Sequence, residues 1–202
     1  LGWISDEQGP PPPTANLTWF RLSRPLFQEL DVAGTNAPLL VVSALPLAAW
    51  SDELEWPDGC TLFIPFQDPE NVGAVIRSAA AFGVARVVLL RESAHPFHPR
   101  SSRAAGTALL QVPLFQGPSI QDLASRSAPI IALDTTGPEV GEEPFPDRFG
   151  LLVGVEGPGL PDRWRQGPRR RVAIVPEVES LNAATAAAIA LYVWSKQSQK
   201  QA

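Results

Sequence analysis

Three separated segments bring small and polar residues together in patterns that could bind a ligand. They are NVGAVIRSAAAFG at residues 71–83, GVEGPGL at 154–160 and VPEVESLNAA at 175–184. Each follows a short apolar run that predicts a buried strand, and α/β sheets build their ligand sites where such strands end. The three segments therefore predict one shared site, with asparagine, arginine, glutamate and serine side chains as its candidate chemical groups.

The middle segment is a glycine-rich loop around Glu156. Glycines permit positive φ and allow a ligand to approach the backbone closely. The loop lacks the GK[ST] ending of a P-loop and the spacing of GxGxxG, so phosphate or dinucleotide binding is disfavoured. Taken alone, it is explained equally well as a plain turn between strands.

The other two segments also have ordinary explanations when each is taken alone. Ser180 can cap the helix that follows it, where free backbone N–H groups would face a ligand. Capping does not require Leu181 and Asn182 beside it. Arg77 lies among small residues two turns into its helix, and the simpler interpretation is a surface arginine paired with a carboxylate.

Short apolar runs alternate with helical patterns from Cys60 onward. The helix at 70–82 can begin at Asp68 or Pro69 and end at Gly83. The alternation predicts an α/β fold with a parallel sheet covered by helices on both sides. The predicted strands are 61–66, 86–90, 129–134, 150–156 and 171–176, and the predicted helices are 70–82, 101–110, 119–127 and 180–196.

The first 57 residues differ in composition from the rest. Residues 1–16 contain the run Pro10–Pro13 and favour an extended, solvated tail. Residues 17–57 could form a strand and a helix but too small a core to be complete. We therefore divide the chain into an N-terminal tail with a partial module at 1–57 and one domain at 58–202.

The bulk composition is that of a soluble globular protein. Of the 202 residues, 45% are hydrophobic and 18% charged, and no run of about 18 apolar residues could span a bilayer. Cys60 excludes an intrachain disulfide because it is the only cysteine, and no signal-peptide pattern opens the chain, so we expect a cytoplasmic protein. With His95 and His98 as the only histidines, no metal-ligand spacing occurs.

Five arginines fall within nine residues in a chain whose net charge is −5. They could form a local patch for nucleic acid. For a charge run in isolation, a solvated loop held by surface ion pairs is the stronger interpretation. The five are Arg163, Arg165, Arg169, Arg170 and Arg171.

The last predicted helix is rich in alanine, so another backbone could approach it closely. Thr185, Ile189 and Tyr192 have the spacing of one helix face. Contact with a partner and ordinary core packing both explain that spacing.

Taken together, the three segments resemble the signature motifs of the SpoU, or TrmH-like, RNA 2′-O-ribose methyltransferases of the SPOUT superfamily. The resemblance extends from about residue 60 to 197, in the family's order. Two departures are the short connection from Pro176 to Ser180 and Ala105 in place of a common serine. The matching residues are Asn71, Gly73 and Arg77; Gly154, Glu156, Gly157 and Gly159; and Ser180, Leu181 and Asn182.

The resemblance implies a parallel sheet flanked by helices with a C-terminal trefoil knot, and methylation of a ribose 2′-hydroxyl in tRNA or rRNA by S-adenosylmethionine. It also implies a homodimer, with close packing of the last helix against the other subunit, and a substrate-binding role for residues 1–57. The implied catalytic residues are Arg77, Asn71, Glu156, Ser180 and Asn182. The implied cofactor contacts are Asp134, Thr135, Gly154, Glu156, Gly157, Gly159, Val175, Pro176, Ser180, Leu181, Asn182 and Ala184. The implied RNA contacts are Arg77, Arg103, Arg163, Arg165, Arg169 and Arg170.

Two other classes of protein remain open from the sequence. A knotted RNA-binding or assembly protein that no longer methylates is favoured by the short connection before Ser180, and opposed by the presence of Asn71, Arg77, Glu156 and Asn182. An unrelated α/β small-molecule enzyme would have an unknotted sheet and no affinity for S-adenosylmethionine.

Overall fold

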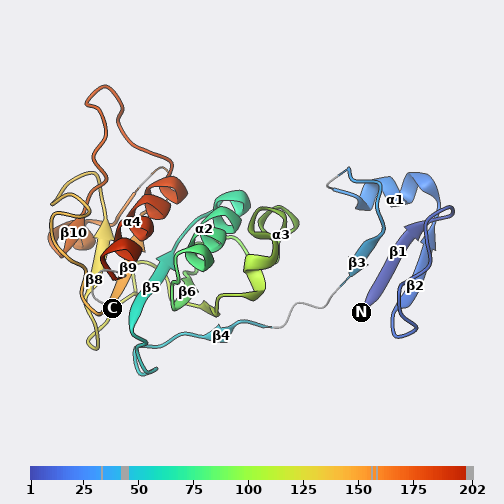
Figure 1. Cartoon of the computed structure of the whole chain (residues 1–202), viewed down its shortest axis with the longest axis horizontal. Helices are drawn as coiled ribbons and strands as arrows, with labels where there is room; N and C mark the ends of the chain where they lie inside the picture. Colours follow the sequence, from blue (N-terminus) through green and yellow to red (C-terminus); the bar gives the residue numbers. More distant parts are fainter. Residues whose placement is uncertain (33, 42–45, 156, 158, 199–202) are drawn as a thin grey trace. The chain divides into compact units, whose positions relative to one another are not determined.

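The computed structural model describes residues 1–32, 34–41, 46–155, 157 and 159–198 (Figure 1). The chain forms two compact units, Leu1–Pro46 and Leu47–Ala202. The contact boundary thus lies eleven residues before the predicted division at residue 57, because the segment after Pro46 packs with the larger unit.

The N-terminal unit contains a three-stranded sheet with the order β2-β1-β3. The expectation that residues 1–16 form a solvated tail is wrong for their first part, because β1 pairs with both of its neighbours. Trp3 Nε1 donates to Pro10 O at 3.0 Å, so the proline run is also bonded to the strand. The elements are β1 (Gly2–Asp6), β2 (Thr18–Leu22), α1 (Arg24–Leu30) and β3 (Leu39–Val41).

The second unit contains a seven-stranded sheet with the order β10-β8-β9-β5-β6-β7-β4, and every pairing in it is parallel. Four of the five predicted strands are confirmed as β5, β6, β8 and β9. The strands are β4 (Ala48–Ala49), β5 (Gly59–Ile64), β6 (Arg86–Leu89), β7 (Leu114–Gln116), β8 (Ile130–Leu133), β9 (Arg148–Val153) and β10 (Arg169–Arg170).

The described residues of this unit form three α-helices, and α2 has the predicted ends. The Asp68 carboxylate accepts a hydrogen bond from Glu70 N at 2.9 Å, and Gly83 follows the helix with a φ of 73°. The helices are α2 (Pro69–Ala81), α3 (Pro99–Ala105) and α4 (Ala183–Ser198), with 3-10 turns at η1 (Gly106–Leu110) and η2 (Asp162–Gln166).

Two predicted elements are wrong. Residues 119–127 form turns instead of a helix, because Glu92 accepts hydrogen bonds from Ser119 Oγ and Ile120 N and fixes a tight turn there. The strand predicted at 171–176 does not form, since β10 covers only Arg169–Arg170, directly before it. The chain from residue 172 instead forms a long loop that projects from the body and leads into α4 (Figure 1).

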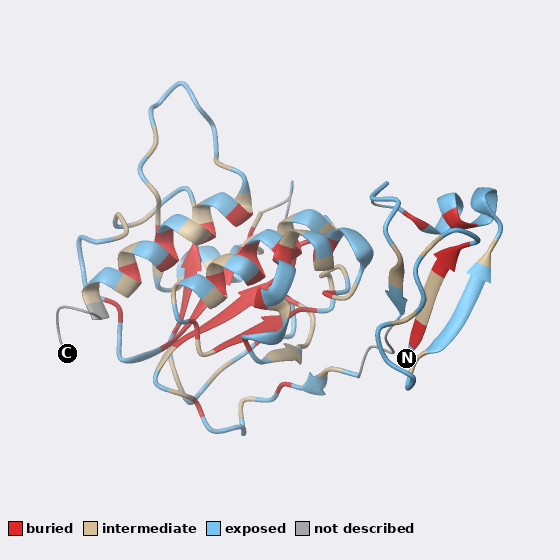
Figure 2. Ribbon diagram, turned by 45° about the vertical axis from the view of Figure 1, so that its right-hand side comes forward, coloured by how far each residue is buried: buried red, intermediate tan, exposed pale blue. Residues whose placement is uncertain are grey.

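The three helices α4, α2 and α3 lie side by side on one face of the sheet (Figure 2). Along β5, Leu62 and Ile64 face the helices, while Phe63 faces the opposite side. No α-helix of the described residues covers that side. Turns and aromatic residues cover it, among them Trp50, Trp56 and Trp164. The parallel sheet flanked by helices is as predicted, but the expectation that helices cover both of its sides is wrong, because turns cover the second side. The trefoil knot stays a prediction.

Candidate functional site

A cavity of about 750 Å³ opens at the carboxyl ends of β8, β9 and β5. This is where strand order reverses, because the chain runs from β5 through β6 to β7 and then returns to β8 on the other side of the sheet. Parallel sheets bind ligands at such a switch point. All three motif segments contribute to the wall, which contains Asn71, Gly154, Gly157, Gly159, Val175, Pro176, Ser180, Leu181 and Asn182.

Two motif residues that are 111 positions apart bond directly at this cavity. Asn182 Nδ2 donates to Asn71 Oδ1 at 3.1 Å. The other amide atom, Asn182 Oδ1, accepts from Thr185 N at 3.1 Å and caps α4. The predicted cap, Ser180, is therefore wrong as a cap, because α4 begins at Ala183. Ser180 lies in the cavity wall.

The glycine loop is a closed turn that requires its glycines. Val155 N donates to Gly159 O at 3.0 Å, and Gly159 N donates to Val155 O at 2.7 Å. A Cβ at Gly154 would lie 3.0 Å from the carbonyl carbon of Gly159, and Gly159 has a φ of 72°. The turn thus exposes backbone to the cavity. Glu156 lies outside the described residues.

The loop after β8 forms the third side of the cavity. Asp134 Oδ1 accepts from Thr135 N at 2.7 Å, and Thr136 Oγ1 donates to Asp134 Oδ2 at 3.2 Å. Asp134 and Thr135, two of the predicted cofactor contacts, both line the cavity. These two hydrogen bonds orient the Asp134 carboxylate, which could also accept a hydrogen bond from a hydroxyl group of a ligand.

Arg77 is on α2 but outside the cavity wall. It lies about 9 Å farther along the helix than Asn71, since a helix rises about 1.5 Å per residue, and its side chain is exposed. Gly73 between them has a packing role. A Cβ there would lie 2.2 Å from Ser101 O, so only glycine allows α3 to approach α2 this closely.

One predicted cofactor contact is misplaced. Ala184 lies on the side of α4 that is buried in the core, whereas Ala183 and Ala186 line the cavity. The helical period rotates Ala184 toward the sheet and its neighbours toward the cavity.

The predicted RNA-binding arginines divide into two groups. Arg163 donates to Ile120 O and Leu123 O, and the nearly buried Arg170 pairs with Glu143 at 2.7 Å, so both are held within the fold. Arg169 donates to Thr136 Oγ1 at 3.3 Å. Arg165 lines the cavity and pairs with Asp162 only at 4.0 Å, and the side chain of Arg103 is exposed on α3.

Sequence reasoning missed three charged residues in the cavity wall, and one of them is Glu179 in the loop before α4. Asp68, considered only as a helix start, places its carboxylate there. Arg171, considered only as part of the basic run, lines the cavity and pairs with Glu139 at 3.8 Å. Asp68 precedes α2 and Arg171 follows β10, at the edge of the sheet where the cavity opens. Their positions next to the ends of predicted strands could have indicated that they belong to the site.

Neither a metal cluster nor a membrane helix occurs in the part of the chain that the structure describes. No three His, Cys, Asp or Glu side chains there could hold a metal ion, and no helix there is long and apolar enough to cross a bilayer. The Cys60 thiol is fully buried in β5, and burial raises its pKa, so it is unsuited to act as a nucleophile.

Comparison with known proteins gives a consistent result. Residues 62–192 match the sequence profile of the SpoU rRNA Methylase family. A protein of Syntrophobacter fumaroxidans (strain DSM 10017 / MPOB) named ribosomal RNA small subunit methyltransferase G 2 is 50% identical over 199 residues, which cover 97% of this chain and 40% of that protein. The chain thus spans less than half the length of this relative.

Two further similarities extend over most of the chain. The 23S rRNA (guanosine(2553)-2′-O)-methyltransferase RlmP of Bacillus subtilis (strain 168) is 29% identical over 180 residues, covering 86% of this chain and 71% of RlmP. The crystal structure of the SpoU methyltransferase AviRb from Streptomyces viridochromogenes, in complex with the cofactor AdoMet, superposes with a TM-score of 0.76 at 23% identity. It covers 98% of this chain and 83% of AviRb, and it confirms the predicted fold class.

Proposed function

The chain belongs to the SpoU rRNA Methylase family, and from this premise we propose that it transfers a methyl group from S-adenosylmethionine to a ribose 2′-hydroxyl of tRNA or rRNA. The observation that carries the proposal is the hydrogen bond from Asn182 to Asn71, which joins the first and third motifs at a cavity that the second motif also lines.

The cavity fits S-adenosylmethionine. Its volume of about 750 Å³ lies within the usual range for small-molecule sites of about 300–1,000 Å³. Leu133, Val153 and Val175 offer apolar contacts for an adenine ring, and the oriented Asp134 carboxylate can accept hydrogen bonds from ribose hydroxyls. Backbone of the glycine loop and of residues 175–182 would complete the contacts.

When bound, S-adenosylmethionine supplies a methyl group on a sulfonium, whose sulfur leaves with the bonding electron pair. The ribose 2′-oxygen forms the new bond to the methyl carbon, and its proton is released to solvent or to a base. Asn71 and Asn182 would align the reacting groups, since their amides are fixed against each other and helix α4. Ser180 would shape the same wall, and Glu156 is assigned a positioning role by the resemblance alone.

Arg77 is better suited to hold a phosphate than to accept the proton. A guanidinium stays protonated in proteins, so it is a poor base near pH 7. Its positive charge can hold the phosphate beside the target ribose and favour the developing oxyanion. The exposed position of Arg77 on α2 supports contact with RNA.

We also propose that the protein is a homodimer formed through α4. The core side of α4 uses Ala184, Ala187 and Leu191, while Thr185, Ile189 and Tyr192 are exposed. Tyr192 packs edge-on against Phe82 with 5.8 Å between the ring centroids, yet it keeps half of its surface exposed. Core packing therefore leaves Thr185, Ile189 and part of Tyr192 available for contact with another subunit. Light scattering on a size-exclusion column should give twice the mass of the chain, and Tyr192→Asp should shift it toward a single copy.

The remaining assignments follow from the same premise. The N-terminal unit would assist RNA binding, and proposed contacts outside it are Arg103 and Arg165, because Arg163, Arg169 and Arg170 are held within the fold. A cytoplasmic location is consistent with an RNA substrate. The alternative, an RNA-binding relative that no longer methylates, predicts a folded protein without affinity for S-adenosylmethionine.

The first experiment is calorimetric titration of S-adenosylmethionine into the protein and three variants. Asn182→Ala removes both amide bonds. Asn182→Asp keeps the acceptor that caps α4 but loses the donor to Asn71, which separates helix capping from the motif contact. Gln121→Ala, an exposed amide outside the cavity, is the control.

We expect binding by the unaltered protein and Gln121→Ala, and at least about tenfold weaker binding by both Asn182 variants, since a lost hydrogen bond of about 1.4 kcal/mol gives that factor. Methyl transfer is then measured with labelled cofactor and ribosomal RNA. A 2′-O-methyl group makes the adjacent phosphodiester resistant to alkali, so labelled dinucleotides after alkaline hydrolysis identify ribose methylation. Absence of cofactor binding by the folded protein would favour the non-methylating alternative.

A further inference from the structure

Most arginine side chains of the protein are bonded within the fold. Each member of this group donates a hydrogen bond of 3.3 Å or less to another residue. They are Arg21, Arg24, Arg86, Arg148, Arg163, Arg169, Arg170 and Arg171. Arg91 and Arg165 make only ion pairs of 4.0 Å.

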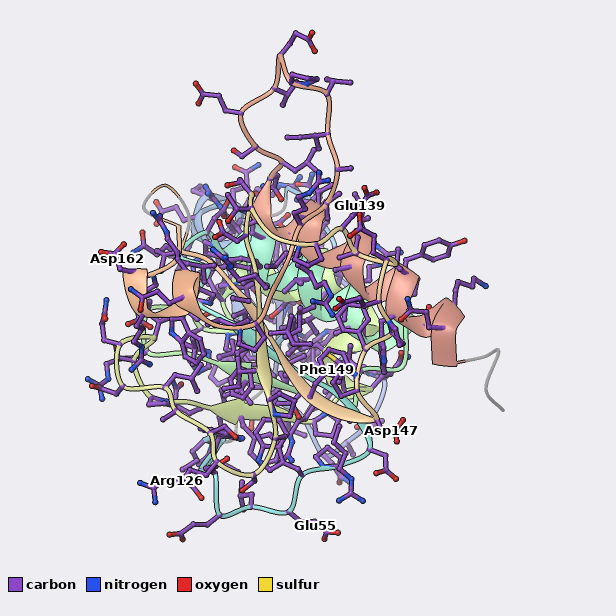
Figure 3. The ribbon with its side chains drawn as sticks, turned by 90° about the vertical axis from the view of Figure 1, so that its left-hand side faces the viewer. Glu55, Arg126, Glu139, Asp147, Phe149 and Asp162 are labelled. Atoms are coloured by element: carbon purple, nitrogen blue, oxygen red, sulfur yellow. The ribbon has the colours of Figure 1, made fainter. Side chains whose placement is uncertain are left out.

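Three of the remaining arginines lie on two helices that touch. Arg77 on α2 and both Arg100 and Arg103 on α3 are exposed, and their guanidinium groups have no partner within the described residues. The helices meet where Gly73 faces Ser101 O. A fourth unpaired guanidinium, Arg126, belongs to the turns on the other face of the sheet, and Figure 3 shows it at the surface, pointing away from the body.

Two exposed histidines stand at the start of α3 beside these arginines. His95 Nδ1 accepts from Phe97 N at 3.2 Å, and His98 Nδ1 accepts from Arg100 N at 3.3 Å. Accepting at Nδ1 requires the neutral ring to carry its hydrogen on Nε2. Each imidazole therefore offers an Nε2–H donor at the surface even when it is uncharged.

Few carboxylates belong to the two helices or to the loop before α3. The only carboxylate within α2 or α3 is Glu70, in the first turn of α2. In the loop before α3, Glu92 is occupied by hydrogen bonds from Ser119 Oγ and Ile120 N. A net charge of −5 for the whole chain thus coexists with a local positive surface, which we call the α2–α3 surface and define as Arg77, His95, His98, Arg100 and Arg103.

We propose that the α2–α3 surface binds the phosphate backbone of the substrate RNA and leads the strand to the cavity. The inference rests on the proposed function. Unpaired guanidinium groups and ring N–H donors are the groups that bind phosphate oxygens. α2 connects the two sites directly, because Asn71 at its first turn lies in the cavity wall and Arg77 lies two turns farther along the same helix. The neighbouring run at residues 163–171, in contrast, is mostly bonded within the fold.

The test uses the full chain and a fluorescein-labelled RNA hairpin of mixed sequence, with anisotropy measured at several salt concentrations. The test variant is Arg100→Gln with Arg103→Gln. The control is Arg126→Gln with Arg148→Gln, which changes the net charge equally away from the α2–α3 surface. Cofactor calorimetry accompanies each protein, and circular dichroism verifies folding.

We expect the test variant to bind the hairpin about tenfold more weakly at low salt. The slope of log affinity against log salt should fall in magnitude by about one to two, since each lost phosphate contact removes about 0.7 to 0.9 from it. The control should retain the affinity and slope of the unaltered protein. Cofactor affinity should be the same in all three.

The outcomes separate this inference from the function on which it rests. Equal affinity and slope in the test variant and the unaltered protein, or an equal loss in the control, would overturn the α2–α3 surface while leaving cofactor binding and methyl transfer intact. An unaltered protein that binds the cofactor but not the hairpin at low salt would also overturn it. An unaltered protein that binds neither would overturn the proposed function as well.

Discussion

The two faces of the seven-stranded sheet bury side chains from the same strands, yet they are covered in different ways. One face packs against α4, α2 and α3 through aliphatic residues and alanines. The other packs against turns and three tryptophans, Trp50, Trp56 and Trp164, whose segments have no α-helix. The comparison teaches that a regular sheet needs a helical cover on one face only, provided that specific side-chain contacts hold the irregular cover in place.

On the irregular face, a few polar residues perform this task. Asp52 accepts from Ser125 Oγ, Arg126 N and Trp56 Nε1 at 2.7, 2.7 and 3.0 Å. Arg86 donates to Glu55 O at 2.6 Å, and its guanidinium lies 5.8 Å from the Trp56 ring centroid. The contacts with Ser125, Arg126 and Arg86 join the segment at 50–56 to other parts of the unit, and the bond from Trp56 to Asp52 fixes the segment itself. Burial lowers the pKa of Arg86.

The largest expected effect is on the helical face. Gly73→Leu should lower the free energy of unfolding by about 3 kcal/mol, because the new side chain would overlap the backbone of α3. Urea unfolding measures it. Ala74→Leu, one residue along on the exposed side of α2, is the matched control and should change stability by less than about 0.5 kcal/mol. Similar losses in both would contradict the close approach of α2 and α3.

On the irregular face, the comparable change is Asp52→Ala. It removes the acceptor of three hydrogen bonds and should lower the free energy of unfolding by about 2 kcal/mol. The exposed neighbour Glu53→Ala should be neutral in the same urea experiment. If Asp52→Ala were also neutral, polar contacts would not be what holds this face.

A smaller pair of changes separates a structural arginine from a ligand-facing one. Arg163→Gln should cost about 1 kcal/mol of stability, because Arg163 donates to Ile120 O and Leu123 O. Arg165→Gln, two residues along, should leave stability unchanged and weaken ligand binding, since Arg165 lines the cavity. Thermal unfolding and calorimetry measure the two properties, and the reverse pattern would exchange the assignments.

The smallest expected effect is a pH dependence of the irregular face. Partial burial alone would raise the pKa of the Asp52 carboxyl, but hydrogen bonds from Arg126 N, Ser125 and Trp56 outweigh it and hold that pKa below its ordinary value. The ionised carboxylate therefore stabilises the fold above about pH 4, and this contribution disappears as the pH falls through the lowered pKa. The difference in stability between the unaltered protein and Asp52→Asn should be constant from pH 7 to about 4 and then shrink. A difference that grew on acidification would contradict this.

The sequence was sufficient for the helical face because that face is periodic. Start and stop signals predicted α2, whose apolar stripe of Val72, Val75, Ile76 and Ala79 is buried, and continuous apolar runs predicted four strands of the parallel sheet. The irregular face carries no period. The predicted helix at 119–127 was wrong because the decisive contacts come from Glu92 and Asp52, which lie far from it in the chain.

The site divides in the same way. The resemblance implied twelve residues that line the cavity, among them Asn71 and Asn182, but it could not show that these two bond to each other. It also could not separate Arg165 from Arg163, since both belong to one basic run. That distinction depends on which backbone carbonyls the fold places beside each guanidinium.

The amide of Asn182 also bears on how the protein is made. Its Oδ1 atom caps α4, and its Nδ2 atom donates to Asn71, which a ribosome would add 111 positions earlier. A nascent chain that ends before Asn182 therefore lacks part of the cavity wall and the contact that ties the last helix to α2. The binding cavity is therefore complete only after the last segment of the domain has been synthesised.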